Sequence, residues 1–511
     1  MESGKQAVAP APKPRVQVID RRQMVLRPMA VEQLIAEDPP ARAIWELVGQ
    51  RDLSRLKAEI KAVEGVAGRE PVDPQLLISL WIYAYSEKIR SAREIERRCG
   101  QLHPGFGWLT GLRVINHHSL SDFRTAQGVG LEQLFVEVLG VLSQAGVVSL
   151  ERVMHDGTKI KANAADNSFR REPSLRQQLA AAQQQVKRLE QQAEQDPDGR
   201  IESRRQRQAQ VRAARERQQR IEQALGELEQ IRASRDDPEK RAQARASLTD
   251  PEARIMKRAQ GAIGPAYNVQ ISTDAGHRVI VGVGVSQAAA DTAELEPAVE
   301  RIEANLDQKP QQMMVDGGFT NQATVQAMEQ REIELVGSLT DRTALTEATL
   351  RKRGLAPEFF PSAFSYDAEL NHDTCPAGKR LRYEGREQQN GNTRYRYRAV
   401  PADCQACPLR RQCCPGSRKG RSLVRTEDSL LMAAFKAKMA TEAAQQIYKQ
   451  RAGLAEFPNA WIKDKLGLRQ FRLRGRVKVG LEALWACLTY NIQQWIRLVW
   501  RPQQQVAPIA T

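Results

Sequence analysis

The sequence lacks any apolar run as long as the roughly 20 residues that a membrane-spanning helix needs. Its first stretch, MESGKQAVAPAPKPRVQ, also lacks the apolar segment of a secretory signal peptide. We therefore expect a cytoplasmic protein with no membrane partner.

Cysteine is scarce, with seven in 511 residues. An odd number cannot pair completely, and a cytoplasmic chain of this length does not suggest a disulfide framework. Five of the seven fall between residues 375 and 414, where metal binding and plain reduced thiols both remain open. Cys99 and Cys487 occupy apolar helical contexts, and we expect them in the core.

Acidic charge does not balance basic charge. The formal net charge is +16 and the isoelectric point is near 9.7. Such a field attracts polyanions, nucleic acid first among them, but says nothing about the fold. A chain of this length predicts two to four domains.

The pattern from residue 21 to 150 is helical, after residues 1–20, a tail with neither a helical nor a strand period that we expect to be flexible. Asp73 followed by Pro74 predicts a capped helix start, and Ser91-Ala92-Arg93-Glu94 predicts a capping box. Six basic residues are available to DNA phosphates, although a solvated helix face is the simpler explanation for each. They are Arg90, Arg93, Arg97, Arg98, Arg113 and Arg124.

An α/β core is expected from residue 151 to 345. Alternation in Val153-Met154-His155-Asp156-Gly157-Thr158 predicts a half-buried strand. The order strand, strand, strand, helix, strand, helix, strand fits a ribonuclease-H-like fold, although periodicity alone does not distinguish it from other α/β folds. The later strands are expected at 266–271, 279–283, 313–315 and 333–337, and the helices at 292–306 and 322–330.

A polar segment, residues 174–247, interrupts this core and is rich in Gln, Ala, Arg and Glu. The turn Asp196-Pro197-Asp198-Gly199 divides it into two helical arms. A thin apolar seam could pair the arms as a coiled-coil-like hairpin, and a polar helical spacer or partly disordered insert is the alternative.

Residues 346–430 form a cysteine-containing insert, and residues 431–511 return to helical character as the C-terminal part of the core. Cys404-x-x-Cys407 is one intact zinc-knuckle spacing. Cys375 precedes a knuckle-like turn without a second thiol, so Cys413 or Cys414 would be the fourth ligand. The predicted structural zinc site is Cys375, Cys404, Cys407 and Cys413, and reduced thiols without metal are the alternative.

Three separated stretches carry a specific resemblance. They are His155-Asp156-Gly157-Thr158-Lys159, Val315-Asp316-Gly317-Gly318-Phe319, and a Tyr448, Arg451, Glu456, Lys463 series within IYKQRAGLAEFPNAWIKDKLGLRQFRLRG. With 117–124 and 249–254, they make the chain resemble, over residues 20–500, the DDE transposases of bacterial insertion sequences. The branch it resembles has an N-terminal helical domain and a tyrosine, arginine, glutamate, lysine signature. The gap from Arg451 to Glu456 is one residue longer than some relatives show.

The resemblance implies that Asp156, Asp316 and Glu456 are the catalytic acids and hold two Mg²⁺ or Mn²⁺ ions. Two such ions activate the attacking oxygen and stabilise the leaving one, and magnesium prefers oxygen ligands. A turn at Asp156-Gly157 and an ordinary loop at Asp316-Gly317-Gly318 are the simpler alternatives. Glu456 is expected near a helix start, because Pro458 follows it closely.

The resemblance also implies that Tyr448, Arg451 and Lys463 contact DNA. The alternatives are a surface ion pair for Arg451 and an exposed helical lysine for Lys463. Basic residues then alternate along the chain, and an extended segment would project them to one side to follow a phosphate backbone. A solvated basic loop is the alternative. These residues are Arg472, Arg474, Arg476 and Lys478. The last helical stretch, 481–499, is expected to be amphipathic and to cover the core sheet.

The function implied is a nucleoid-associated transposase. It would bind the terminal inverted repeats of its element in double-stranded DNA, cut a strand, and join the freed 3′-hydroxyl to target DNA. The helical domain of residues 21–150 would bind DNA or mediate dimerisation, and a homodimer or higher oligomer is expected on DNA. Two alternatives stay open: a non-catalytic DNA-binding regulator derived from a transposase, and a ribonuclease-H-like nuclease that hydrolyses without joining.

Overall fold

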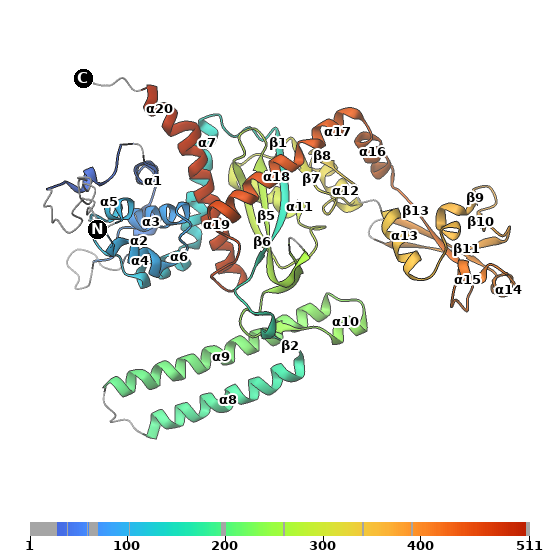
Figure 1. Ribbon diagram of the computed structural model, residues 1–511, viewed down its shortest axis with the longest axis horizontal. Coiled ribbons are helices and arrows are strands. Elements are labelled where there is room, and N and C mark those ends of the chain that lie inside the picture. The colour runs from blue at the N-terminus through green and yellow to red at the C-terminus, as the bar shows by residue number, and fades with distance from the viewer. Residues whose placement is uncertain are drawn as a thin grey trace, which may run out of the picture.

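This computed structural model describes residues 28–506, apart from 38, 59, 61–69, 102, 196–200, 259–260, 340–341 and 390–391. The tail at residues 1–20 and the turn at 196–199, both predicted from the sequence, lie outside the described residues. Figure 1 shows a helical N-terminal part, a central sheet flanked by helices, a long two-helix arm, and a small part set apart at one end. No helix in the described ranges is long and apolar enough to cross a membrane.

The N-terminal part is helical, as predicted. The predicted cap is present at α3, where the Asp73 carboxylate accepts the backbone N–H of Gln75 at 2.8 Å. The predicted capping box is wrong: α4 starts after Ser91, but the Ser91 side chain makes no cap hydrogen bond. Glu94 is instead engaged by the guanidinium groups of Arg97 and Arg98. The helices are α1 (Pro40–Gly49), α2 (Ser54–Ala58), α3 (Pro74–Ser86), α4 (Ala92–Gly100), α5 (Pro104–Thr110), α6 (His117–Ala126) and α7 (Gly128–Gln144), after a 3-10 turn at Val31–Leu34.

The central sheet confirms a mixed α/β class. Strand β1 lies inside it, antiparallel to β5 on one side and parallel to β7 on the other. Strand β8 is parallel to β7, and β4 and β6 both pair antiparallel with β5. Its strands are β1 (Arg152–Lys161), β4 (Arg254–Lys257), β5 (Ile263–Asp274), β6 (Ile280–Ser286), β7 (Gln312–Val315) and β8 (Glu334–Gly337), with α11 (Leu295–Leu306) and α12 (Gln322–Gln330) between them. The apolar run of β7 is wholly buried, as a parallel strand covered on both faces requires.

The two predicted arms are α8 (Glu172–Gln195) and α9 (Ile201–Ala233), which pack together beside the short α10 (Pro238–Ala242). Their inward positions follow alternating steps of three and four residues, as in a coiled coil. These positions are Leu175, Leu179, Ala182, Val186 and Leu189 on α8, and Val211, Ala214, Gln218, Ile221, Leu225 and Leu228 on α9. At the base of the arm, β2 (Phe169–Arg170) pairs with β3 (Ala246–Ser247), next to a 3-10 turn at Asp166–Ser168.

The cysteine-containing part has its own sheet, ordered β13-β12-β11-β10-β9 with antiparallel neighbours. Its elements are α13 (Arg342–Lys352), 3-10 turns at Pro357–Phe359 and Pro361–Ala363, β9 (Ser365–Asp367), β10 (His372–Thr374), β11 (Arg380–Gln389), β12 (Asn392–Ala399), α14 (Pro401–Gln405), α15 (Arg410–Cys413) and β13 (Ser422–Glu427). The chain then returns to the core through α16 (Leu430–Met439), α17 (Glu442–Lys449) and α18 (Arg451–Ala460), which continues as a π-helical turn, Trp461–Lys465.

Helix α19 (Arg476–Trp495) is the central helix, followed by a π-turn at Ile496–Trp500 and α20 (Arg501–Val506). The expectation of an amphipathic helix is wrong, because α19 packs on β6 on one side and on α3 and α7 on others, and is buried nearly all round. Asn491, 0% exposed, accepts the N–H of Ile280 at 2.9 Å and donates to its carbonyl at 2.8 Å. One side chain thus satisfies both backbone polar groups of Ile280.

Replacing this amide should destabilise the core. Asn491→Leu leaves both backbone groups of Ile280 buried without partners, so we expect the free energy of unfolding to fall by about 3 kcal/mol. Urea unfolding of the purified chain measures it. Asn305→Ala is the matched comparison, since Asn305 donates only once, to the carbonyl of Val281, and should cost about 1 kcal/mol. An unchanged urea midpoint in Asn491→Leu would show that packing alone holds α19 on the sheet.

Candidate active site

The pairing of β1 with β7 brings two of the predicted acids together. Met154 on β1 is paired with Met314 on β7, and the strands are parallel. Asp156 and Asp316 each come two residues after this pair. They lie on the same face of the sheet, because side chains alternate along a strand. Burial, then the negative charge of Asp316, raises the pKa of Asp156 to about 6. Two carboxylates therefore face each other at the sheet.

The two acids lie in different local structure, Asp156 inside a strand and Asp316 directly after one. Asp156 lies within β1, so the alternative of a turn at Asp156-Gly157 is wrong. Gly157 is required by close packing: a Cβ atom there would lie 2.4 Å from Oδ1 of Asp291 and 2.7 Å from Nε2 of Gln270. Asp316 does begin a loop, and its carboxylate accepts the N–H of Gly318 at 2.7 Å, which fixes its orientation.

A buried polar layer supports β1 from the opposite face. His155 shares hydrogen bonds with Ser272 Oγ at 2.9 Å and Gln270 Oε1 at 2.8 Å, and burial lowers the pKa of His155 to about 3, so the ring is neutral. Asp291 accepts from Lys159 at 2.6 Å and from Asn268 at 2.6 Å. Burial opposes ionisation of Asp291, but these hydrogen bonds hold its pKa below the ordinary value.

Sequence reasoning missed Asp291. Like Asp316, Asp291 is an acid that follows an apolar strand, in this case β6. The same sequence pattern could therefore have identified it. Its charge adds to those that raise the pKa of Asp156.

Helix α18 covers the two acids. Asn459 donates from Nδ2 to the Asp156 carboxylate at 2.9 Å, and its own Oδ1 is buried without a partner among the described residues. Lys463 donates to Thr158 Oγ1, two residues after Asp156 on the same face. Burial lowers the pKa of Lys463, against the attraction of Asp156. Asn459 was missed by sequence reasoning, although it lies three residues after Glu456 and four before Lys463.

Glu456 is placed differently from the expectation. It is the sixth residue of α18, not near a helix start, and Pro458 lies inside the same helix. Burial of Leu454, Ala455 and Pro458 against the sheet holds this segment helical despite the proline. Glu456 itself is exposed and makes no hydrogen bond or ion pair with another described residue.

The structure thus brings Asp156 and Asp316 together and leaves Glu456 on the outer side of α18. Within the described ranges, no three His, Cys, Asp or Glu side chains are arranged to hold a metal ion. Asp156 and Asp316 are the pair that could bind a hard divalent cation through oxygen.

Two residues of the predicted DNA-contacting set lie where α17 meets α18, Tyr448 near the end of α17 and Arg451 at the start of α18. The Tyr448 hydroxyl donates to Ser338 Oγ at 2.8 Å. Arg451 lies over the Tyr448 ring, 5.7 Å from its centroid, and its charge opposes the rise in the pKa of Asp156. A cation therefore borders the acidic pair.

The basic residues predicted to follow a phosphate backbone are all exposed, but they do not form one extended segment; they are Arg472, Arg474, Arg476 and Lys478. Arg472 and Arg474 belong to a loop, whereas Arg476 and Lys478 belong to α19. The carboxylate of Glu252 accepts the N–H of Arg476 and so caps the start of this helix. The Arg474 side chain donates to the carbonyl of Asn163 at 3.1 Å.

The four predicted zinc ligands lie around one cavity, together with Cys414. They are Cys375, Cys404, Cys407 and Cys413. Cys99 and Cys487 are buried in helices, as predicted.

Two comparisons with protein families bear on this arrangement. A model described as a transposase DDE domain matches residues 374–496, and a model described as a transposase domain (DUF772) matches residues 29–126. These matches support a DDE-type insertion-sequence transposase. No curated protein and no solved structure was found to match the chain.

The transposase matches cover α1 to α6 of the N-terminal part and the region from just before Cys375 through the end of α19. Glu456 and Lys463 fall inside the second of these regions, whereas Asp156 and Asp316 fall outside both. The case for the acidic pair therefore comes from the sheet itself.

Replacing Asp156 should stabilise the metal-free protein at high pH. Its folded pKa of about 6 lies above the 3.8 of a free aspartate side chain. Ionisation of Asp156 therefore destabilises the folded state fully above pH 6 and not at all below pH 4. We expect Asp156→Asn to recover up to about 3 kcal/mol at pH 8 and nothing at pH 4, measured as a change in Tm with chelator present. Asp122→Asn, an exposed position on α6, should change nothing at either pH.

Divalent metal should stabilise the wild type more than Asp156→Asn. Mn²⁺ should raise the Tm of the wild type at pH 8, less so at pH 5, where protons compete for Asp156. Asp156→Asn and Asp316→Asn should both lose this response. An equal response in all three proteins would exclude the acidic pair as the metal site.

Proposed function

We propose that this chain is a DDE transposase that binds the terminal inverted repeats of an insertion sequence, cuts DNA there, and joins the freed 3′ end to target DNA. The observation that carries the proposal is the acidic pair, Asp156 and Asp316, on neighbouring parallel strands in a chain with two transposase matches. Perturbed carboxylates of this kind concentrate at functional sites.

The sheet supports a ribonuclease-H-like core. On one side of β1 lies β5, with which β4 and β6 both pair, and on the other side lie two parallel strands, β7 and β8, each followed by a helix. The two-helix arm and the cysteine-containing part are then insertions into this core. The acids sit where β1 and β7 are adjacent, in the middle of the sheet.

Two Mg²⁺ or Mn²⁺ ions, bound by Asp156, Asp316 and Glu456, would activate the attacking oxygen and stabilise the leaving oxygen of a phosphodiester. The chain supplies the geometry. Asn459 fixes one oxygen of Asp156 by its hydrogen bond, and Lys463 and Arg451 place positive charge beside the acids where a phosphate would lie. No serine or tyrosine nucleophile is needed, because no covalent protein–DNA bond forms.

Glu456 completes the site by turning inward. It lies on α18 three residues before Asn459, so the two are neighbours on the helix surface. Pro458 and the π-turn at Trp461–Lys465 are features at which a helix changes its course or register. We propose that metal and DNA together draw the Glu456 carboxylate towards Asp156.

A basic path runs from the acids along β1. Lys463 contacts Thr158, Gln470 forms a bridge with Lys161, and the Arg472–Arg474 loop binds the backbone after β1. With a rise of about 3.3 Å per residue, Asp156 to Asn163 spans roughly 20 Å, or about six base pairs of DNA. We propose that the terminal repeat lies along this path.

Two DNA ends must meet for transposition, so we propose a homodimer or higher assembly on DNA. The two-helix arm extends well beyond the core (Figure 1) and carries exposed arginines on its outer half. Such a surface suits contact with phosphates of a second DNA end. The exposed arginines include Arg205, Arg212, Arg217 and Arg220.

One alternative is favoured by a specific observation. Glu456 is exposed and separate from the acidic pair, which favours a DNA-binding regulator that no longer cuts. The wild-type activity decides between the two functions.

Strand cleavage and joining test the proposed function. On a labelled duplex that carries the terminal repeat of the element, with Mg²⁺ or Mn²⁺, wild type should give cut and joined products. Asp156→Ala, Asp316→Ala and Glu456→Ala should each reduce product at least about 100-fold while still binding DNA, because each removes a metal ligand. Glu442→Ala, an exposed glutamate on α17, should react like the wild type.

Each other outcome has a definite meaning. Binding without cleavage by the wild type supports the regulator. Cleavage without joining supports a ribonuclease-H-like nuclease. Full activity in Glu456→Ala alone would show that the third acid is a different residue.

The basic path makes a separate prediction about affinity. Arg472→Gln with Arg474→Gln should weaken binding to the terminal repeat and reduce the slope of log affinity against log salt by about 2, since each arginine displaces roughly one counterion. Titration at several salt concentrations measures the slope. Lys352→Gln with Arg353→Gln, two exposed basic residues at and just after the end of α13, is the comparison pair and should leave the slope unchanged. An unchanged slope in the Arg472 and Arg474 variant would place the DNA elsewhere.

A further inference from the structure

The cysteine-containing part has a small hydrophobic core of its own. Its sheet, β9 to β13, encloses a separate hydrophobic cluster with five buried members: Phe364, Leu381, Tyr397, Ala399 and Leu423. It stands apart from the main core and is joined to it by α13 and the end of β13 (Figure 1).

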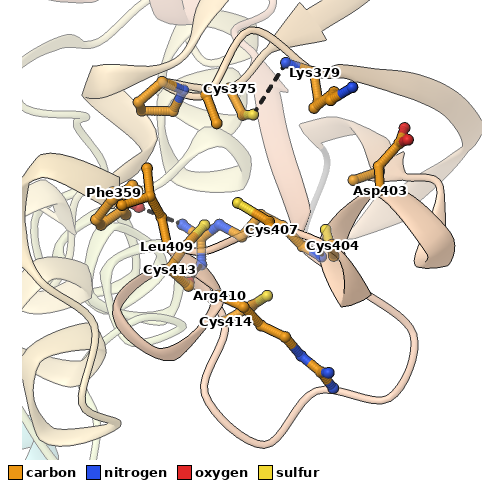
Figure 2. A pocket seen from close by; sticks show the side chains of 14 residues that line it. Phe359, Cys375, Lys379, Asp403, Cys404, Cys407, Leu409, Arg410, Cys413 and Cys414 are labelled. Carbon is orange, nitrogen blue, oxygen red and sulfur yellow. Dashed lines mark hydrogen bonds between the residues drawn. The ribbon is translucent and has the colours of Figure 1, made fainter.

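Five thiols surround one small cavity in this part. The cavity measures about 30 Å³, room for a single small ion, and Figure 2 shows the cysteines arranged around it. They come from three places in the chain. Cys375 follows β10, Cys404 and Cys407 lie on and just after α14, and Cys413 and Cys414 end α15. The thiol of Cys413 is near enough to those of Cys375, Cys404 and Cys414 for their charges to interact.

Backbone donors already point at two of these sulfurs. The N–H of Lys379 donates to Cys375 Sγ at 3.3 Å, and the N–H of Arg421 donates to Cys404 Sγ at 3.4 Å. A neutral thiol is a weak acceptor, whereas an ionised sulfur makes a charge-assisted hydrogen bond. The backbone is therefore arranged for negative sulfur.

A buried cation lacks a carboxylate partner at the same place. Arg421 is 8% exposed, donates from Nη2 to the carbonyl of Phe359 at 2.8 Å, and lies over the Phe364 ring. Its Nε has no hydrogen-bond partner among the described residues, and no carboxylate of the described chain forms an ion pair with it. Its charged neighbours are the thiols of Cys404, Cys413 and Cys414. A buried charge is costly without an opposite charge, which thiolates would provide.

We infer that Cys375, Cys404, Cys407 and Cys413 bind one structural Zn²⁺ as thiolates. Four thiols release their protons to solvent on binding, and no oxidation or reduction is involved. Zinc favours a tetrahedral set of four such ligands, and the resulting site carries a net negative charge that Arg421 offsets. As the side chains lie, no three of the described ligand residues are arranged around one point, so binding draws the thiols into the cavity.

Cys414 is outside the ligand set. Its side chain is buried, whereas the side chains of the four proposed ligands are only partly buried. This makes Cys414 the matched control for Cys413, one residue away with the same chemistry. The inference does not depend on transposition.

Metal content of the purified full-length chain tests the site. Elemental analysis of protein prepared without added metal should find about one zinc per chain. Cys404→Ser and Cys413→Ser should lose it, while Cys414→Ser and Cys99→Ser should retain it. Zinc retained by Cys413→Ser and lost by Cys414→Ser would overturn the assignment of Cys413.

A measurement on the wild type alone covers variants that fail to fold. Titration of its thiols with an organomercurial should release zinc to a chromogenic chelator, and Co²⁺ exchanged for zinc should show thiolate-to-metal charge-transfer absorption. Absence of zinc above the buffer level in the wild type would overturn the inference, whatever the result of the strand-transfer assay.

Discussion

The parallel pairing of β1 with β7 is the constraint on which the candidate site depends. It places two carboxylates on one face of a sheet, and everything around them compensates for that placement. On the opposite face, a neutral His155 and the ion-paired Asp291 fill the space under Gly157. Above the acids, α18 contributes a neutral donor and two cations. The antiparallel pairing with β5 along nearly all of β1 keeps the strand from shifting in register.

This arrangement exchanges stability for function. A buried carboxylate beside a like charge is unfavourable without a cation, and a cation is what such a pair would bind. The same balance occurs at Arg421, where a buried positive charge stands among thiols. In both places the protein holds an electrostatic imbalance that a metal ion would correct, with oxygen ligands at one and sulfur ligands at the other.

Much of the core could be predicted from sequence because its strands are short apolar runs, and in the case of β7 an acid follows directly. Helix α12 has the predicted bounds, and β7 begins one residue earlier than expected. What could not be predicted depends on packing between distant segments. Pro458 suggests a helix start by local rules, yet burial against the sheet keeps it mid-helix, and the role of Asn459 follows only from where α18 crosses β1. Asp156 and Asp316 could be proposed from the order of motifs along the chain, whereas the outward position of Glu456 is visible only in the three-dimensional structure.

The base of the two-helix arm has a consequence for how such chains vary. Pairing of β2 with β3, and the hydrogen bond between Ser168 and Ser247, bring the two ends of the insertion together before it leaves the core. The inward positions of α8 and α9 repeat every seven residues, so removing or adding one repeat in each helix preserves their packing. Each repeat changes the length of the arm by about 10 Å. Insertions or deletions of whole repeats therefore change the length of the arm in fixed steps and leave the sheet that carries the acids unaltered.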